Sequence, residues 1–91
     1  MNRGTQTEGA DVVQAYVLMR ILPGKLSDAL GQIQRTPGVK MAHAVTGPTD
    51  IIAYVETESM DTLGRLIVSR FQETVGVTRT TTCVVTPVSG A

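Results

Sequence analysis

Residues 39–55, VKMAHAVTGPTDIIAYV, contain the pattern that decides the fold: two apolar runs with five turn-forming residues between them. The two runs predict β-strands because they are short, apolar and bounded by turn residues. In the connection, Gly47 can adopt a positive φ, Pro48 fixes one backbone angle, and Asp50 can accept hydrogen bonds from nearby N–H groups. A connection this short predicts an antiparallel hairpin, and its outward-pointing backbone amides also suit a small polar ligand.

On either side of this hairpin, the spacing of apolar residues predicts two further strands and two helices. Continuous β-rich runs at 14–22 and 77–86 predict the strands. Apolar residues at helical spacing predict helices over 25–35 and from the N-cap Ser59 to about residue 71. The predicted order is therefore strand, helix, strand, strand, helix, strand.

The chain also contains an internal repeat. Ala15-Tyr16-Val17 recurs as Ala53-Tyr54-Val55, an offset of 38 positions from 15 to 53. The same offset aligns Gln34 with Gln72, Thr36 with Thr74, and Gly38-Val39 with Gly76-Val77. Two strand–helix–strand halves joined by a hairpin predict a ferredoxin-like α+β sandwich, with a four-stranded antiparallel sheet and both helices on one face. Two unrelated halves are the alternative.

The length of 91 residues predicts one domain, over 14–86, between polar tails at 1–13, expected to be flexible, and 87–91. Lys and Arg together number 8, as do Asp and Glu, so the formal net charge is zero and no basic stripe favours nucleic-acid binding. Cys83 is the only cysteine, which excludes an internal disulfide and fits a reducing cytoplasm. The sequence shows neither a signal peptide nor an apolar run of membrane-spanning length.

Both faces of the predicted sheet are apolar. In the first strand Val17 and Met19 alternate with Tyr16 and Leu18, and Arg20 is the polar exception. The two helices can cover only one face of the sheet. The apolar residues on the other face predict that a second copy packs against it, sheet to sheet, in an obligate homodimer of the dimeric α/β-barrel type. A general preference of strands for apolar residues is the alternative explanation.

Few side chains suggest catalysis. His43 is the only histidine, and no acid, nucleophile or metal ligand is predicted beside it, which favours a packed strand histidine over a general base. Cys83 lies next to valines, where a thiol usually behaves as a small hydrophobic group. We therefore predict no catalytic residue, no metal and no cofactor.

Threonines alternate along the last predicted strand, at positions 78, 80, 82 and 86. They are either strand-forming residues on an exposed face or hydrogen-bonding groups for a small zwitterion or a neighbouring subunit. The sequence pattern leaves both interpretations open.

Three runs resemble the effector-binding domain of the Lrp/AsnC family of transcriptional regulators: AYVLMRILPGK at 15–25, TPGVKMAHAVTGPTDIIAYVE at 36–56 and VGVTRTTTCVV at 75–85. The most specific pieces are Pro37-Gly38-Val39, the turn Val45-Thr46-Gly47-x-x-Asp50, and the strand Gly76-Val77-x-Arg79-Thr80-x-Thr82. The resemblance implies a ferredoxin-like domain that dimerises through its sheet. It also implies rings of dimers, commonly octamers, with a small effector, usually an amino acid, bound between dimers near the hairpin turn.

The resemblance implies an effector site built mainly from that turn. Its lining residues would be Thr46, Gly47, Pro48, Thr49 and Asp50, with Thr80 and Thr82 as hydroxyl partners from the last strand. The N–H groups of a Gly-containing turn suit a carboxylate, and Asp50 suits an α-ammonium or braces the turn. Pro48 and Thr49 depart from the acidic and aromatic residues often found in the family's turn.

Family regulators carry a helix-turn-helix domain before this module, whereas residues 1–13 are too few for three helices. We therefore expect a stand-alone effector domain that does not bind DNA itself. It would sense an amino acid or co-assemble with a full-length regulator. Two alternatives stay open: a small dimeric α/β-barrel enzyme, monooxygenase-like or isomerase-like, and an assembly protein without a ligand.

Overall fold

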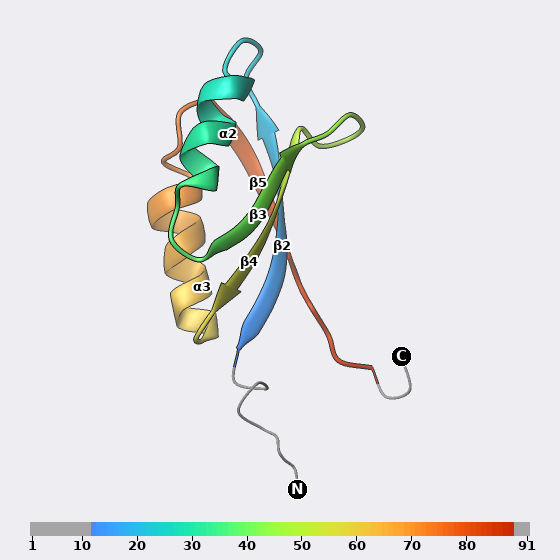
Figure 1. Cartoon of the computed structure of the whole chain (residues 1–91), viewed down its shortest axis with the longest axis vertical. Coiled ribbons are helices and arrows are strands. Elements are labelled where there is room, and N and C mark those ends of the chain that lie inside the picture. Colours follow the sequence, from blue (N-terminus) through green and yellow to red (C-terminus); the bar gives the residue numbers. More distant parts are fainter. Residues whose placement is uncertain (1–11, 89–91) are drawn as a thin grey trace, which may run out of the picture.

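Four antiparallel strands form one sheet in the order β3-β4-β2-β5. The computed structural model describes residues 12–88. Its strands are β2 (Val13–Ile21), β3 (Val39–Ala44), β4 (Ile51–Thr57) and β5 (Val77–Val84). Its helices are α2 (Leu26–Gln34), α3 (Met60–Leu66) and the π-helical turn η1 (Ile67–Phe71). Figure 1 shows both helices on one face of the sheet, which confirms the predicted ferredoxin-like sandwich.

Strand ends differ from the predicted boundaries by one or two residues. β2 ends one residue early because Leu22 begins the following turn, where its carbonyl accepts a hydrogen bond from the Lys25 N–H at 3.1 Å. β5 ends at Val84 rather than at residue 86. Most of the two predicted tails lies outside the described residues, and Val13 already belongs to β2.

The internal repeat is present in the backbone geometry. Thr36 and Thr74, which the repeat aligns, are both buried, and each hydroxyl donates at 2.8 Å to the carbonyl four residues earlier. Gly38 and Gly76 follow with φ angles of 95° and 85°, a region that favours glycine. The two helix-to-strand connections therefore have the same local structure, as the repeat predicts.

The core fills the space between the sheet and the helices. Alternate residues of the two central strands point into it, because successive side chains of a strand face opposite sides. One stripe of each helix completes it. The buried apolar residues are Ala15, Val17, Met19, Ile21, Ala29, Ile33, Ala42, Ile51, Ala53, Val55, Leu63, Leu66 and Phe71.

The second helix widens before it ends. α3 begins after Ser59, whose side-chain oxygen accepts a hydrogen bond at 3.1 Å from the N–H three residues later, as the predicted N-cap does. From Ile67 the chain continues as η1, in which the Gln72 N–H donates to the Ile67 carbonyl at 2.9 Å. This five-residue hydrogen-bond step places Leu66 and Phe71 on the same side, where both are buried.

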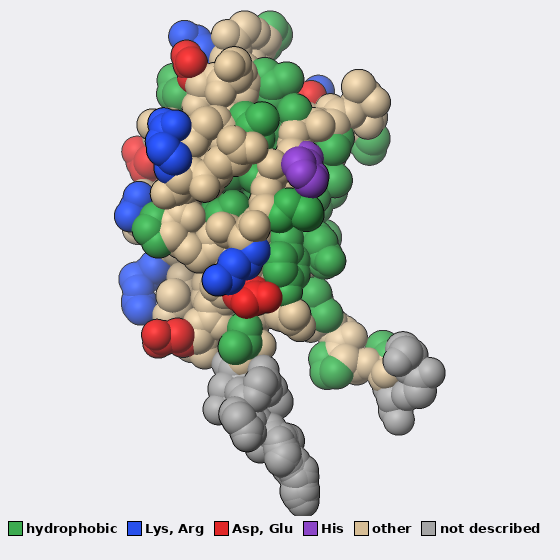
Figure 2. Space-filling view, viewed as in Figure 1, with side chains coloured by type: hydrophobic (Ala, Val, Ile, Leu, Met, Phe, Trp, Pro, Cys, Tyr) green, Lys and Arg blue, Asp and Glu red, His purple; other side chains and the backbone are tan. Residues whose placement is uncertain are grey.

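The other side of the sheet exposes apolar side chains. This open face comprises Tyr16, Leu18, Met41, Ile52 and Tyr54, which pair across the three strands β2, β3 and β4. Tyr16 is 42% exposed and Met41 40%. Figure 2 shows hydrophobic side chains along the side of the sheet that faces away from the helices. Both sheet faces are apolar, as predicted, whereas the homodimer itself stays a prediction.

Candidate functional site

The hairpin turn lies at the end of the sheet where β3 ends and β4 begins. The Val45 N–H donates to the Asp50 carbonyl at 2.9 Å and closes the turn. Gly47 has a φ of 132°, a conformation that disfavours other side chains, and no atom lies within 4 Å of the position a Cβ would take. The predicted hairpin is therefore present, with an exposed glycine at its tip.

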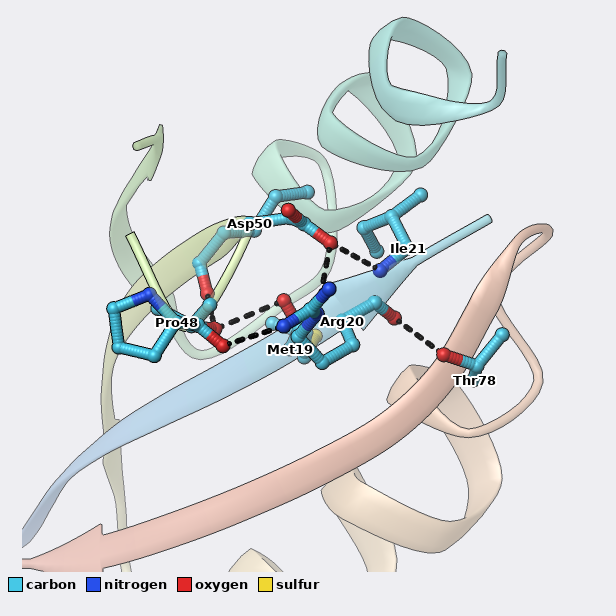
Figure 3. Close-up of polar contacts among 8 residues, drawn as sticks. Met19, Arg20, Ile21, Pro48, Asp50 and Thr78 are labelled. Carbon is cyan, nitrogen blue, oxygen red and sulfur yellow. Dashed lines mark hydrogen bonds and ion pairs between the residues drawn. The ribbon is translucent and has the colours of Figure 1, made fainter. Parts of the chain in front are cut away.

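The Asp50 carboxylate fastens the turn to β2 (Figure 3). Its Oδ2 accepts a hydrogen bond from the Ile21 N–H at 2.8 Å and lies 3.3 Å from the Arg20 Nε. The Asp50 N–H in turn donates to the Met19 carbonyl at 3.0 Å. This carboxylate oxygen already has two partners within the chain, which favours the bracing role over direct contact with an ammonium group.

Pro48 and Thr49 are held against the same strand. The Arg20 Nη1 donates to the Pro48 carbonyl at 2.8 Å, and the Thr49 hydroxyl donates to the Met19 carbonyl at 3.0 Å. Thr49 is only 8% exposed, so its hydroxyl points inward, whereas Thr46, Gly47 and Pro48 are exposed. The turn thus has a fixed base and an open tip.

The structure brings the five turn residues together but does not bring Thr80 and Thr82 beside them. These threonines pair with Met19 and Val17, so they share the helix-covered side of the sheet, and β5 is separated from β4 by β2. Thr80 accepts a long hydrogen bond of 3.5 Å from the Gln72 side chain. Within one chain, the two hydroxyls and the turn therefore do not form a single site.

Arg20 is a site residue that the local sequence pattern does not single out. It supplies two of the polar contacts to the turn, although the two residues it meets there lie 28 and 30 positions away. The available signal was its place as the one charged residue in the apolar run of the first strand. A charge in a half-buried strand usually has a partner, but the sequence pattern did not identify which one.

A second polar group lies on the open face at the other end of the central strands. The Tyr54 hydroxyl accepts a hydrogen bond from the Gln14 side chain at 2.6 Å and donates one to the Glu56 carboxylate at 2.9 Å. Its ring packs against Tyr16 with 5.1 Å between the centroids. Desolvation and the hydrogen bond to Glu56 raise the pKa of Tyr54 above its usual value.

A cleft of about 630 Å³ opens between α3, the start of β3 and the end of β4. Charges of both signs line it: Lys40, Arg65 and Arg70 beside Glu56 and Glu58. It lies at the opposite end of the sheet from the turn and shares no residue with it, so it is a separate feature.

His43 and Cys83 are both exposed on strands at the edges of the sheet. His43 pairs with Ile52, and Cys83 with Tyr16.

In the part of the chain that the structure describes, no group of three or more His, Cys, Asp or Glu side chains is placed to hold a metal ion. Among residues 12–88 no helix is long and apolar enough to cross a membrane.

Residues 14–88 match the family model of the Lrp/AsnC ligand binding domain. A helix-turn-helix-type transcriptional regulator of Pyrococcus horikoshii is 32% identical over 73 residues, which cover 77% of this chain and 49% of the relative. The chain therefore spans about half the length of the curated relatives it matches.

Solved structures share the fold. A protein of Thermus thermophilus superposes with a TM-score of 0.80 at 25% identity, over 87% of this chain and 99% of that one. A transcriptional regulator of Neisseria meningitidis, solved in complex with L-methionine, gives a TM-score of 0.80 at 18% identity, over 100% of this chain and 63% of that one.

Proposed function

Because this chain belongs to the Lrp/AsnC ligand-binding domain family, we propose that it binds a small effector, an amino acid, at the hairpin turn and modulates transcription through ligand-dependent assembly. Two relatives support the ligand class and the context. The Pyrococcus relative is a helix-turn-helix-type regulator, and the Neisseria regulator binds L-methionine. Regulation by binding, without catalysis, is the corresponding activity.

The observation that carries this proposal is the turn itself. Contacts to β2 fix Pro48, Thr49 and Asp50, while Thr46 and Gly47 stay exposed at the tip. A fixed backbone with an exposed tip binds a small polar ligand at low entropic cost, because the turn need not be ordered at the moment of binding. Asp50 serves as the brace of this turn.

The open face provides the surface through which two copies associate. Packing the open faces of two copies together removes from water the apolar side chains that the helices leave uncovered. Dimers then join into a ring, an octamer by analogy with the family, in which Thr80 and Thr82 of a neighbouring subunit complete the site around the turn. The same interfaces allow mixed assembly with a full-length regulator in the cytoplasm, which supplies the DNA contact.

The effector acts by shifting the assembly equilibrium. A ligand held between subunits stabilises the assembled state by its differential affinity for that state. The occupied ring and the free dimer would then affect a partner regulator differently.

A thermal-shift series with each of the twenty amino acids at millimolar concentration tests the proposal. A ligand that binds only the folded state stabilises it by about 2.7 kcal/mol at a hundredfold excess over its Kd. We expect one amino acid, or a few related ones such as L-methionine, to raise Tm. Absence of a shift with all twenty would contradict the amino-acid proposal and leave the assembly protein as the better interpretation.

Thr46→Trp locates the site. The new side chain fills the tip of the turn without touching the contacts that hold its base, and we expect the Kd of the effector to rise at least about tenfold, which is about 1.4 kcal/mol. Val68→Trp is the matched control, because Val68 is 59% exposed on the helical side of the sheet. Equal affinity in both variants would place the ligand away from the turn.

A further inference from the structure

Two arginines lie opposite each other beside the turn. The β2–β5 register pairs Arg20 with Arg79 directly, and directly opposed residues of antiparallel strands point to the same side, with Cβ atoms about 4.5–5.5 Å apart. The register shifts just beyond this pair, where Thr78 is left without a cross-strand partner, and the Thr78 hydroxyl donates to the Arg20 carbonyl at 3.2 Å (Figure 3). The sheet therefore holds two guanidinium-bearing positions as cross-strand neighbours.

This arrangement has more positive than negative charge. Like charges directly opposite each other in a sheet are destabilising. Residues 12–88 contain one ion pair, between Arg20 and Asp50, and no described carboxylate lies within ion-pairing distance of Arg79. Two guanidinium groups with one carboxylate leave a single positive charge, which one monoanionic group would balance.

The geometry leaves donors available for that anion. Arg20 uses its Nε and Nη1 on the turn, and a guanidinium carries five N–H donors in a planar fork. Arg79 is exposed. A planar carboxylate matches the fork of an arginine better than a compact anion does, because it accepts two parallel hydrogen bonds.

We propose that Arg20 and Arg79 form the anion-binding part of the effector site and hold the carboxylate group of the ligand. The inference rests on the proposed function only in taking the ligand to be the effector. Arg20 also positions the turn, so one side chain links ligand charge to turn geometry. The preferred ligands are carboxylic acids, and loss of the carboxylate, rather than of the amino group, abolishes binding.

The first experiment is independent of the amino-acid proposal. Tm is measured in sodium acetate and in sodium chloride at equal ionic strength, for the wild type, Arg79→Gln and the matched control Arg65→Gln on α3. We expect acetate to raise Tm above chloride in the wild type and in Arg65→Gln, and the two salts to be equivalent in Arg79→Gln. In chloride, Arg79→Gln should itself raise Tm by about 1–2 °C, because it removes the like-charge pair.

The second experiment connects the anion site to the effector. Calorimetric titrations compare L-methionine, N-acetyl-L-methionine and L-methioninamide. We expect the first two to bind and the amide not to bind, and we expect Arg79→Gln to raise the Kd of L-methionine at least about tenfold, as for a lost charged hydrogen bond. Arg65→Gln should bind as the wild type does.

The outcomes separate the two proposals. An acetate preference that persists in Arg79→Gln, or is absent from the wild type, overturns the anion site. L-methionine binding that is unchanged in Arg79→Gln overturns it too, and leaves the proposed function intact. An Arg79-dependent acetate preference in a protein that none of the twenty amino acids stabilises supports the anion site and rejects the amino-acid effector.

Discussion

The two faces of the sheet have nearly the same chemistry but different partners. On the covered face Val17 is fully buried against the helices, whereas its neighbour Tyr16, on the open face, is 42% exposed. Both faces carry large apolar side chains along β2 and β4. The two faces are therefore not distinguished by their composition. They are distinguished by the two helices, which cover one face and leave the other exposed.

The difference teaches that one sheet can serve folding and assembly separately. Substitutions on the covered face should lower the stability of each chain, because they remove contacts within it. Substitutions on the open face should alter association with little effect on the fold of a single chain.

Phe71→Ala should cause the largest loss of stability. Phe71, the last residue of η1, is fully buried in the core. Removing a buried phenylalanine ring typically lowers the free energy of unfolding by about 3–5 kcal/mol, through lost burial and the cavity left behind. Urea unfolding measures this loss. Val68→Ala, on the exposed side of the same helical turn, should change stability by less than about 0.5 kcal/mol. Similar losses in the two variants would contradict the assigned core.

Leu18→Glu should break the assembly. Leu18 pairs with Ile52 and Thr81 on the open face, and failing to bury one leucine costs about 1.5–3 kcal/mol of association free energy. Sedimentation at several concentrations should show a shift from dimers or larger species to monomers, with retained helical and sheet circular dichroism. Loss of the fold on dissociation would instead favour the obligate homodimer that the sequence predicts, and would contradict the separation of folding from assembly.

Thr49→Val, at the base of the hairpin turn, should lower stability by an intermediate amount. It keeps the buried shape but removes the hydroxyl that donates to the Met19 carbonyl, which costs about 1 kcal/mol and lowers Tm by about 4–8 °C. Thr46→Val is the matched control, because Thr46 is exposed. Equal Tm values would show that the inward hydroxyl contributes little to holding the turn.

The ionisation of Tyr54 should have the smallest effect on stability, and this effect should be confined to high pH. Its pKa is raised in the folded state by desolvation and by Glu56, so the protonated phenol favours folding below about pH 10, and this contribution is lost as the pH rises through the raised pKa. Tm of the wild type should therefore fall more steeply than that of Tyr54→Phe as the pH rises above about 10. Tyr16→Phe, which keeps the Tyr54–Glu56 bond, should retain the steep fall. Parallel profiles for the wild type and Tyr54→Phe would refute the assignment.

Local patterns were sufficient for the element order, the hairpin and the repeat. The matching Thr36 and Thr74 hydroxyl bonds show why, since each is completed within four residues of chain. The widening of the helix at Ile67 was not predictable from apolar spacing, because an α-helix and a π-turn both place residue 71 near the same stripe. The turn residues were identified from sequence, but the inward direction of the Thr49 side chain was not.

Local patterns in the sequence predict the strands and helices, the repeat and the apolar nature of both sheet faces, and the resemblance indicates the family. These properties depend on the identity and spacing of neighbouring residues. Three features appear only in the folded chain: Arg20 meets Asp50, Thr80 and Thr82 lie on the helix-covered side, and Arg79 lies opposite Arg20. Strand order and register decide these contacts, because they bring together residues that are tens of positions apart along the chain.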